Sequence, residues 1–153
     1  LLRFNALQRR GKKLRFEKSS IHGWGLIADE DINAGEMVIE YIGEIITQEM
    51  ADKREKVYDR KGFGATYMFH LDKDSVIDAT RRGNAARYIN HSCEPNCYST
   101  IISVNGQKKV VLYAKKSIRK GDELNYDYMF TVEDEDKKVP CLCGAEKCRK
   151  FMN

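Results

Sequence analysis

Short stretches in which hydrophobic and polar positions alternate make up most of the chain, and turn-forming residues separate them. Val, Ile, Tyr and Phe are frequent in these stretches, which favours strands over helices. The predicted strands cover residues 13–18, 21–28, 37–46, 65–71, 76–79, 99–104, 108–114 and 124–128. Asn105-Gly106 separates two of them and predicts a tight hairpin turn.

One segment follows a helical pattern instead. Residues 48–59 place apolar side chains on one face, with Thr47 positioned to cap the N-terminus and Gly62 after the end. The residues expected on the buried face are Met50, Ala51, Val57 and Tyr58. A helical turn is also predicted over residues 84–88. The pattern as a whole indicates one domain that is mainly β with short helices.

Composition narrows the class of protein. Of 153 residues, 42% are hydrophobic and 33% charged, with 2 Pro and 11 Gly, which excludes collagen-like and largely disordered chains. We expect no membrane-spanning segment, because no apolar run approaches about 18 residues. We also expect no secretory signal, because no charged segment followed by an apolar one opens the chain.

The net charge of +4 is unevenly distributed. Residues 1–18 contain seven Lys or Arg and one Glu, whereas the rest of the chain has a net charge of −2. The basic segment either contacts nucleic acid or an acidic partner, or is a solvated lead-in, and we favour the last interpretation. The mildly acidic remainder suits a basic ligand better than a phosphate backbone.

Three of the five cysteines, Cys141, Cys143 and Cys148, lie within eight residues near the C-terminus. Closely spaced thiolates in a chain without a secretory signal predict structural zinc, which takes four soft ligands in a tetrahedron. The fourth ligand would be Cys93, Cys97 or a histidine, and the spacing does not choose among them. The alternative, that these are ordinary free thiols, fits three such close neighbours poorly.

Residues 87–97 form a segment dense in polar and metal-ligating side chains. A nucleophilic pair of His91 and Cys93 is one interpretation, but two positions apart on an irregular loop they need not face each other. The other two interpretations are a polar loop whose side chains hydrogen-bond to its own backbone, and a cofactor site. Tyrosines also stand out, because Tyr126 and Tyr128 alternate to the same face of a strand and could wall a narrow slot.

Five motifs in order resemble a known family. They are His22-Gly23-Trp24-Gly25, then Tyr67, then Arg87-x2-Asn90-His91-Ser92-Cys93-x-Pro95-Asn96, then Gly121-Asp122-Glu123-Leu124-x-Tyr126-Asp127-Tyr128, then Cys141-x-Cys143-x4-Cys148. This series resembles SET-domain protein lysine methyltransferases with a post-SET tail, over roughly residues 12–153. Residues 36–41, 78–80 and 148–153 resemble the trithorax/MLL and COMPASS-type branch.

The resemblance implies a fold and a division of the chain. The fold would be mainly β with short helices, built from small curved sheets with a pseudoknot and followed by a zinc-binding tail. Residues 1–12 would be a basic lead-in, residues 13–130 the SET domain with a helical insert at about 47–64, and residues 131–153 the post-SET segment.

The resemblance also assigns roles to residues. S-adenosylmethionine would be the cofactor, bound by His22, Trp24, Tyr67, Asn90, His91 and the backbone at Leu142. Zinc would be held by Cys93, Cys141, Cys143 and Cys148, which leaves Cys97 free. The walls of a channel for the substrate lysine would be Tyr41, Tyr126 and Tyr128. Tyr128 would supply the essential hydroxyl, and Tyr126 would influence how many methyl groups are added.

The implied activity is methylation of a histone lysine, lysine 4 of histone H3, by the catalytic subunit of a COMPASS-type complex in the nucleus. Expected partners are the histone H3 tail, the nucleosome, and WD-repeat and SPRY-domain subunits. An alternative is a catalytically weak SET domain that binds histones or serves as a scaffold. A zinc-stabilised nucleic-acid module, suggested by residues 1–18 alone, is the third hypothesis, and the acidic remainder argues against it.

Overall fold

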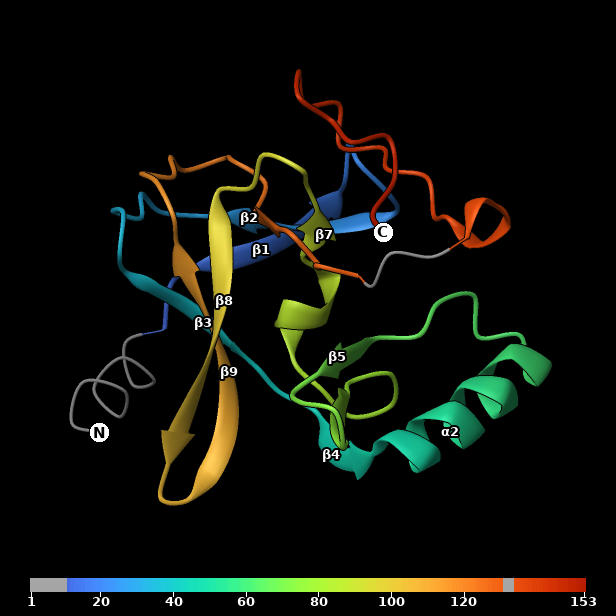
Figure 1. Ribbon diagram of the computed structural model, residues 1–153. Helices are drawn as coiled ribbons and strands as arrows, with labels where there is room; N and C mark the ends of the chain where they lie inside the picture. The colour runs from blue at the N-terminus through green and yellow to red at the C-terminus, as the bar shows by residue number, and fades with distance from the viewer. Residues whose placement is uncertain (1–10, 131–133) are drawn as a thin grey trace. The chain divides into compact units, whose positions relative to one another are not determined.

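The computed structural model describes residues 11–130 and 134–153, and most of the predicted basic lead-in lies outside them (Figure 1). The elements in chain order are β1 (Leu14–Lys18), β2 (Trp24–Ala28), β3 (Met37–Tyr41), β4 (Glu44–Thr47), α2 (Gln48–Arg60), β5 (Met68–His70), β6 (Ser75–Asp78), η1 (Ala85–Tyr88), β7 (Asn90–His91), β8 (Cys97–Val104), β9 (Gln107–Ala114), β10 (Asn125–Tyr126) and η2 (Glu135–Lys137). They form small sheets of two or three strands, among them one with the order β3-β9-β8. The prediction of a mainly β chain with short helices is confirmed.

The chain divides into two compact units, and the first comprises the described parts of residues 1–39, 88–100 and 112–153. In it, β1 pairs with β2 in antiparallel register from Leu14↔Ala28 to Lys18↔Trp24. A shorter pairing, β10 with β7, is parallel and places Tyr126 opposite His91. The core of this unit includes Leu26, Ile32, Ile118 and Leu124, each at most 1% exposed. The parallel pair therefore joins two sequence-distant polar segments at the edge of an apolar core.

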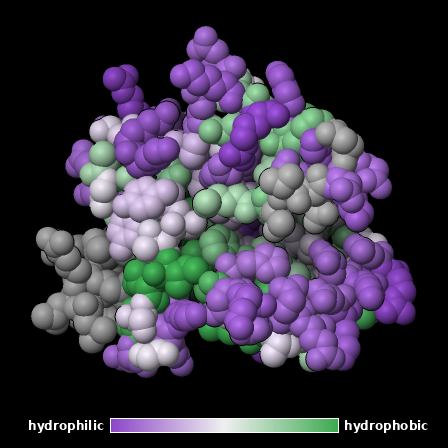
Figure 2. Space-filling view, in the orientation of Figure 1, coloured by the Kyte–Doolittle hydropathy of each residue, from purple (hydrophilic) through white to green (hydrophobic). Residues whose placement is uncertain are grey.

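The second unit comprises residues 40–87 and 101–111. Its sheet has the order β4-β6-β5, and the central strand β6 buries Val76, Ile77 and Asp78. Helix α2 contacts both β4 and β6. The predicted cap is confirmed, because Oγ1 of Thr47 accepts the Met50 N–H over 3.2 Å. Figure 2 shows that the surface over α2 is largely hydrophilic, as expected for a helix with one narrow buried face.

One prediction about this region is wrong in detail. Met50 and Val57 do not lie on the buried face of α2, because they are 44% and 37% exposed. The strands predicted over residues 37–46 are β3 and β4, which separate at Gly43. A Cβ on Gly43 would lie 2.7 Å from the Asp78 carbonyl oxygen, so only glycine permits this close approach to β6.

The hairpin prediction is confirmed. Asn105 and Gly106 alone separate β8 from β9, and both have positive φ angles, 51° and 76°, as a two-residue hairpin turn requires. Strand β7 was not predicted, since two residues leave no periodic pattern. None of the helices among residues 11–130 and 134–153 is long and apolar enough to cross a membrane.

Candidate active site and cysteine cluster

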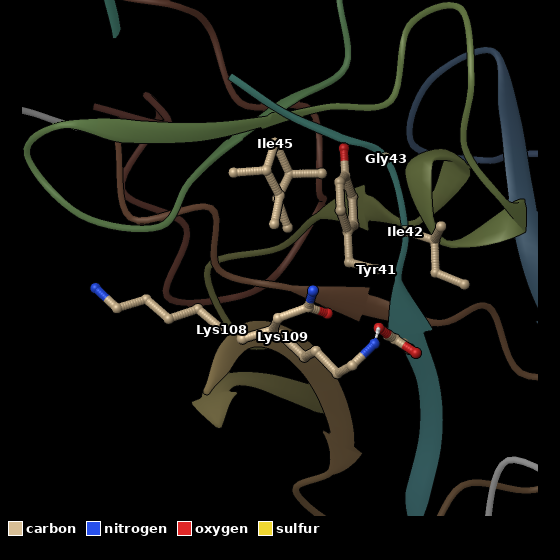
Figure 3. A pocket seen from close by; sticks show the side chains of 9 residues that line it. Tyr41, Ile42, Gly43, Ile45, Lys108 and Lys109 are labelled. Carbon is tan, nitrogen blue, oxygen red and sulfur yellow. Dashed lines mark hydrogen bonds and ion pairs between the residues drawn. The ribbon is translucent and has the colours of Figure 1, made fainter. Parts of the chain in front are cut away.

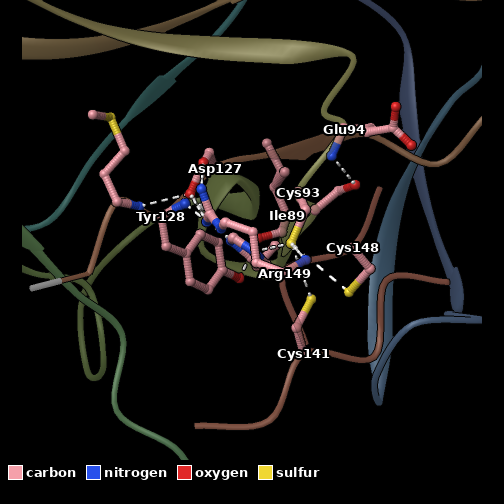
Figure 4. A network of polar contacts seen from close by, with 11 residues as sticks. Ile89, Cys93, Glu94, Asp127, Tyr128, Cys141, Cys148 and Arg149 are labelled. Atoms are coloured by element: carbon pink, nitrogen blue, oxygen red, sulfur yellow. Dashed lines mark hydrogen bonds and ion pairs between the residues drawn. The ribbon is translucent and has the colours of Figure 1, made fainter. Parts of the chain in front are cut away.

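Four cysteines from two distant segments meet in the first unit. The Sγ atoms of Cys93, Cys141, Cys143 and Cys148 all lie within 4.8 Å of one another. Cys93 lies 3.7 Å from Cys141 and 3.9 Å from Cys148, sulfur to sulfur (Figure 4). Four sulfurs placed tetrahedrally at the usual Zn–S length would lie about 3.8 Å apart. The donor set and its spacing therefore fit zinc.

Backbone N–H groups near the cluster donate hydrogen bonds to two of its sulfurs. The backbone N–H of Arg149 donates to Sγ of Cys93 over 3.4 Å, and that of Lys150 donates to Sγ of Cys148 over 3.3 Å. Burial raises the pKa of the Cys93 thiol and raises that of Cys141 to about 12, whereas hydrogen bonds outweigh burial at Cys143 and lower its pKa to about 6. Backbone donors to ligating thiolates are a usual part of such sites.

Cys97 lies apart from this cluster. It is 0% exposed at the start of β8, and burial raises the pKa of its thiol to about 12. A thiol of this kind stays protonated and behaves as a small apolar side chain. The spacing of cysteines along the chain did not choose between Cys93 and Cys97. In the structure Cys93 lies with the three tail cysteines.

His91 connects the cluster with Tyr128. Its Nε2 lies 3.5 Å from Sγ of Cys93, and its Nδ1 accepts the backbone N–H of Tyr128 over 3.1 Å. Burial lowers the pKa of His91, although the charge of Asp127 opposes the shift. A neutral ring fits these contacts, because Nδ1 must lack a proton to accept one. The approach of Asp127 to Nδ1, 3.6 Å, is therefore not an ion pair.

The two tyrosines predicted to share a face do lie together. The rings of Tyr126 and Tyr128 are 4.9 Å apart between centroids, and Tyr128 also contacts His91 at 5.2 Å. The Tyr128 hydroxyl donates to the carbonyl oxygen of Ile89 over 2.7 Å. Because its proton is directed there, this phenol oxygen can act toward another group only as an acceptor.

Asn90 organises the loop between β1 and β2. Its Nδ2 lies 3.1 Å from the carbonyl oxygens of both His22 and Trp24, and 3.0 Å from Oγ of Ser19. Glu123 joins the same group, with Oε1 2.9 Å from this Nδ2. The amide hydrogens of Asn90 are therefore shared among acceptors from two segments, residues 19–24 and Glu123, and they fix the path of the predicted cofactor loop. Sequence reasoning did not single out Ser19 or assign a role to Glu123.

Large apolar side chains remain exposed in this unit. The Trp24 side chain is 56% exposed and Leu142 is 59% exposed. Trp24 begins β2, next to the loop held by Asn90, and Leu142 lies on the cysteine-bearing tail.

Tyr41 and Tyr67 belong to the second unit. Tyr41 ends β3, is 5% exposed, and has its ring 5.4 Å from that of Phe69. Tyr67 precedes β5, where its N–H donates to Oγ1 of Thr80 over 2.9 Å. The Arg87 guanidinium lies 5.8 Å from the centre of the Tyr67 ring. The structure thus describes both residues as fixed parts of the second unit.

A pocket of about 200 Å³ lies beside Tyr41, between the end of β3 and the start of β9 (Figure 3). Ile45 and Ile77 supply apolar walls, and Nζ of Lys109 is held by Glu40 over 3.0 Å. Tyr41 is the only predicted site residue among the described residues that line it. The pocket is therefore not identified as the channel of the predicted site.

Part of the basic N-terminal segment falls among the described residues. Nζ of Lys12 lies 2.9 Å from Oε2 of Glu36, and Arg15 pairs with both Glu17 and Asp29. These cations are thus neutralised by carboxylates of the same chain. Their pairing favours the solvated lead-in over nucleic-acid contact for the part of the segment that the structure describes.

The SET domain family matches residues 23–129. Histone-lysine N-methyltransferase SETD1B is 58% identical in Xenopus tropicalis and 56% identical in Homo sapiens, each over 153 residues. The Aspergillus oryzae histone-lysine N-methyltransferase, H3 lysine-4 specific, is 51% identical over 154 residues. All of this chain is covered, but only 8% of each SETD1B protein and 12% of the fungal protein. As its motifs predicted, the chain belongs to the SET domain family.

Proposed function

We propose that this chain is the catalytic domain of an S-adenosylmethionine-dependent histone lysine methyltransferase that acts on lysine 4 of histone H3. The observation that carries the proposal is the clustering, in one unit, of Tyr126, Tyr128, Asn90, His91 and the four-cysteine cluster. The names of the relatives support both the reaction and the lysine position.

The reaction explains why tyrosines would surround the substrate. A free lysine has a pKa near 10.4, so only about 0.04% of it is neutral and nucleophilic at pH 7. A narrow aromatic channel removes water from the ammonium form, which lowers the lysine pKa, and it holds the amine in line with the methyl group. The cofactor supplies that electrophilic methyl group when it is bound.

Tyr128 would orient the reacting groups rather than remove a proton. Its own hydroxyl proton is directed at Ile89, so the phenol oxygen presents a partial negative charge. Tyr126, whose ring lies beside it, would limit the space for methyl groups already added. Tyr41 is proposed as the third wall of the channel. His22, Trp24, Tyr67, Asn90, His91 and Leu142 would bind the cofactor.

The four-cysteine cluster would hold zinc as a structural ion that fastens the tail to the body of the first unit. The relatives are much longer than this chain, and the finer context proposed here follows from the family resemblance. The proposed setting is the nucleus, in a COMPASS-type complex on the nucleosome. WD-repeat and SPRY-domain subunits would stimulate the reaction, and any nucleic-acid contact would be made through residues 1–18. The proposed domain limits remain 1–12, 13–130 and 131–153.

The test is transfer of a labelled methyl group to histone H3, read by mass spectrometry at each lysine, with and without the partner subunits. Lysine 4 should be labelled, and replacing it by arginine should abolish the product. Tyr128→Phe should lose nearly all turnover while cofactor binding persists, and Tyr126→Phe should shift products toward higher methylation. Tyr98→Phe, which changes a 43% exposed tyrosine stacked on Tyr113, is the matched control.

Two results would refute parts of the proposal. Peptide binding without any methyl transfer, even with partner subunits, would identify a histone-binding module instead. Methylation of a different lysine would leave the reaction standing and reject the proposed position.

A further inference from the structure

Asp127 and Arg149 join the cysteine-bearing tail to the segment that carries the two tyrosines. Nη1 of Arg149 donates to Oδ2 of Asp127 over 2.7 Å, and Nη2 donates to Oδ1 over 2.9 Å (Figure 4). Two parallel bonds between a planar guanidinium and a carboxylate fix direction as well as distance. Since Asp127 lies between Tyr126 and Tyr128 in the sequence, the ion pair acts on the backbone that links the two rings.

Asp127 also stabilises the turn that follows Tyr128. Its Oδ1 accepts the backbone N–H of Met129 over 3.0 Å. Met129 has a φ of 53°, in the left-handed region that few residues other than glycine adopt without cost. A carboxylate that bonds to the backbone two residues later is a common way to hold such a turn. The side chain of Asp127 therefore connects Arg149 with a strained position beside Tyr128.

Arg149 contacts the body at two points. Its backbone N–H donates to Sγ of Cys93, and its side chain reaches Asp127. Among the described residues, Cys93 is the one member of the cysteine cluster that does not belong to the tail. A metal held by Cys93 and three tail cysteines would attach the tail to the body at a single residue.

A single attachment leaves a segment able to pivot about it. The Lys147 N–H bonds to Glu94, but this contact lies next to Cys93 and does not move the attachment point far. Asp127 lies on a different segment of the body from Cys93. The Asp127–Arg149 pair is therefore a second attachment of the tail, and it would prevent rotation about the first. The pair is half-exposed, with Arg149 51% and Asp127 24% accessible, so its strength should depend on salt.

We propose that Asp127 and Arg149 are positioning residues, whose ion pair latches the tail of residues 139–153 onto the Tyr126–Tyr128 segment. The latch keeps the tail, with Leu142, in a fixed place relative to the tyrosine pair. Its effect on catalysis rests on the proposed function, whereas the latch itself is a property of the folded chain.

The first experiment requires no catalysis. The zinc-loaded chain is compared as wild type, Arg149→Ala, Arg149→Lys and Asp127→Asn, by amide exchange in the tail and by zinc transfer to a chromogenic chelator. Informative amides are those of Cys141, Cys148 and Met152, which bond within the tail. Arg149→Ala should speed both processes about threefold to tenfold, and Arg149→Lys, which keeps the charge but loses the fork, should fall between.

The control is Arg15→Ala, which also removes a partly exposed arginine from two carboxylates in the same unit. It should leave exchange in the tail and zinc transfer unchanged. Added salt should speed both processes in the wild type and have much less effect in Arg149→Ala. Thermal unfolding of each variant shows whether it is folded, and Arg149→Lys carries the test if the alanine variant does not fold.

The second experiment follows methyl transfer. Arg149→Ala should raise the KM for S-adenosylmethionine by a factor similar to that for zinc transfer while kcat changes less than about twofold, since the tail acts on binding. A merely structural role would lower the active fraction and leave KM unchanged. Unchanged tail exchange and zinc transfer in Arg149→Ala would overturn the latch, whether or not methyl transfer occurs. Altered exchange in a chain without methyl transfer would reject the proposed function alone.

Discussion

Asp78 and Asp127 each bond to an arginine, and they differ in burial. Asp78, in the second unit, is 0% exposed and bonds to Arg54 over 2.9 Å. Asp127, in the first unit, has its side chain 24% exposed and bonds to Arg149 through two bonds. Withdrawal of a charge from water makes the loss of its partner costly, whereas water replaces the partner of an exposed charge. The same pair of residue types thus stabilises the fold in one unit and positions a segment in the other.

Asp78 is the junction between helix α2 and its sheet. Its Oδ2 accepts bonds from Nη1 of Arg54 and from the Tyr58 hydroxyl, the latter over 2.8 Å, and its Oδ1 accepts the Thr80 N–H over 2.9 Å. Burial would raise the pKa of Asp78, but these bonds, led by that of Arg54, outweigh it and hold the pKa below its usual value. Because Thr80 also accepts the N–H of Tyr67, the junction extends to a residue proposed to bind the cofactor.

Metal removal should have the largest effect, and the two units should respond to it differently. Structural zinc contributes an apparent 10–16 kcal/mol in small zinc-finger peptides, so about this scale of stabilisation is lost locally when a chelator takes the ion. The tail should lose amide protection, while α2 and the sheet around Asp78 keep theirs. Alkylation followed by mass spectrometry should then modify Cys93, Cys141, Cys143 and Cys148 rapidly. Cys97 should stay unmodified, because its thiol is fully buried with a pKa raised to about 12.

Full denaturation in the same assay is the control, since all five cysteines must then react. Rapid modification of Cys97 after chelation would contradict a loss of structure confined to the tail, because Cys97 lies in the buried start of β8 in the same unit and its core would then depend on the metal. Modification of none of the four would reject the cluster as a zinc site.

Asp78→Asn should have the second largest effect. The amide keeps the shape but loses the charge that Arg54 and Tyr58 bond to, and one hydrogen bond to a charged group is worth about 1.5–3 kcal/mol. We therefore expect the free energy of unfolding, measured by urea titration, to fall by about 2–3 kcal/mol. The control is Glu49→Gln, which removes one partner of an exposed pair with Lys53 on the same helix and should change little. Equal effects of the two variants would contradict the role of burial.

Sequence analysis found the features that depend on neighbouring residues. Thr47 and Asn105-Gly106 act within a few positions, so their roles as cap and turn followed from residue type. The choice of Cys93 over Cys97 came only from the family resemblance, because spacing along the chain does not say which loop returns to the tail. The aspartate–arginine pairs span 24 and 22 residues, and no periodic pattern indicates such partners. Met50 was placed wrongly because an apolar residue near a helix end need not face the core.

Acid should test the buried junction further. A carboxyl whose pKa is lower in the folded state contributes stability that is present above its unfolded pKa, about 4, and lost as the pH falls through the folded value. Asp78 has such a lowered pKa, so the free energy of unfolding should fall below about pH 4. Asp78→Asn should show a shallower fall over that range in urea titrations at several pH values. An identical slope in the two proteins would mean that other carboxyls account for the acid sensitivity.

Asp127→Asn should have the smallest effect on global stability. Its partner Arg149 is 51% exposed and can be hydrated when the charge is removed, so the free energy of unfolding should fall by about 1 kcal/mol or less. The same variant should nevertheless speed amide exchange in the tail, while Asp78→Asn should leave the tail unaffected and weaken protection in α2. Urea titration and amide exchange on both variants give this crossed pattern. A large loss of global stability in Asp127→Asn would show that the half-exposed pair supports the fold as the buried one does.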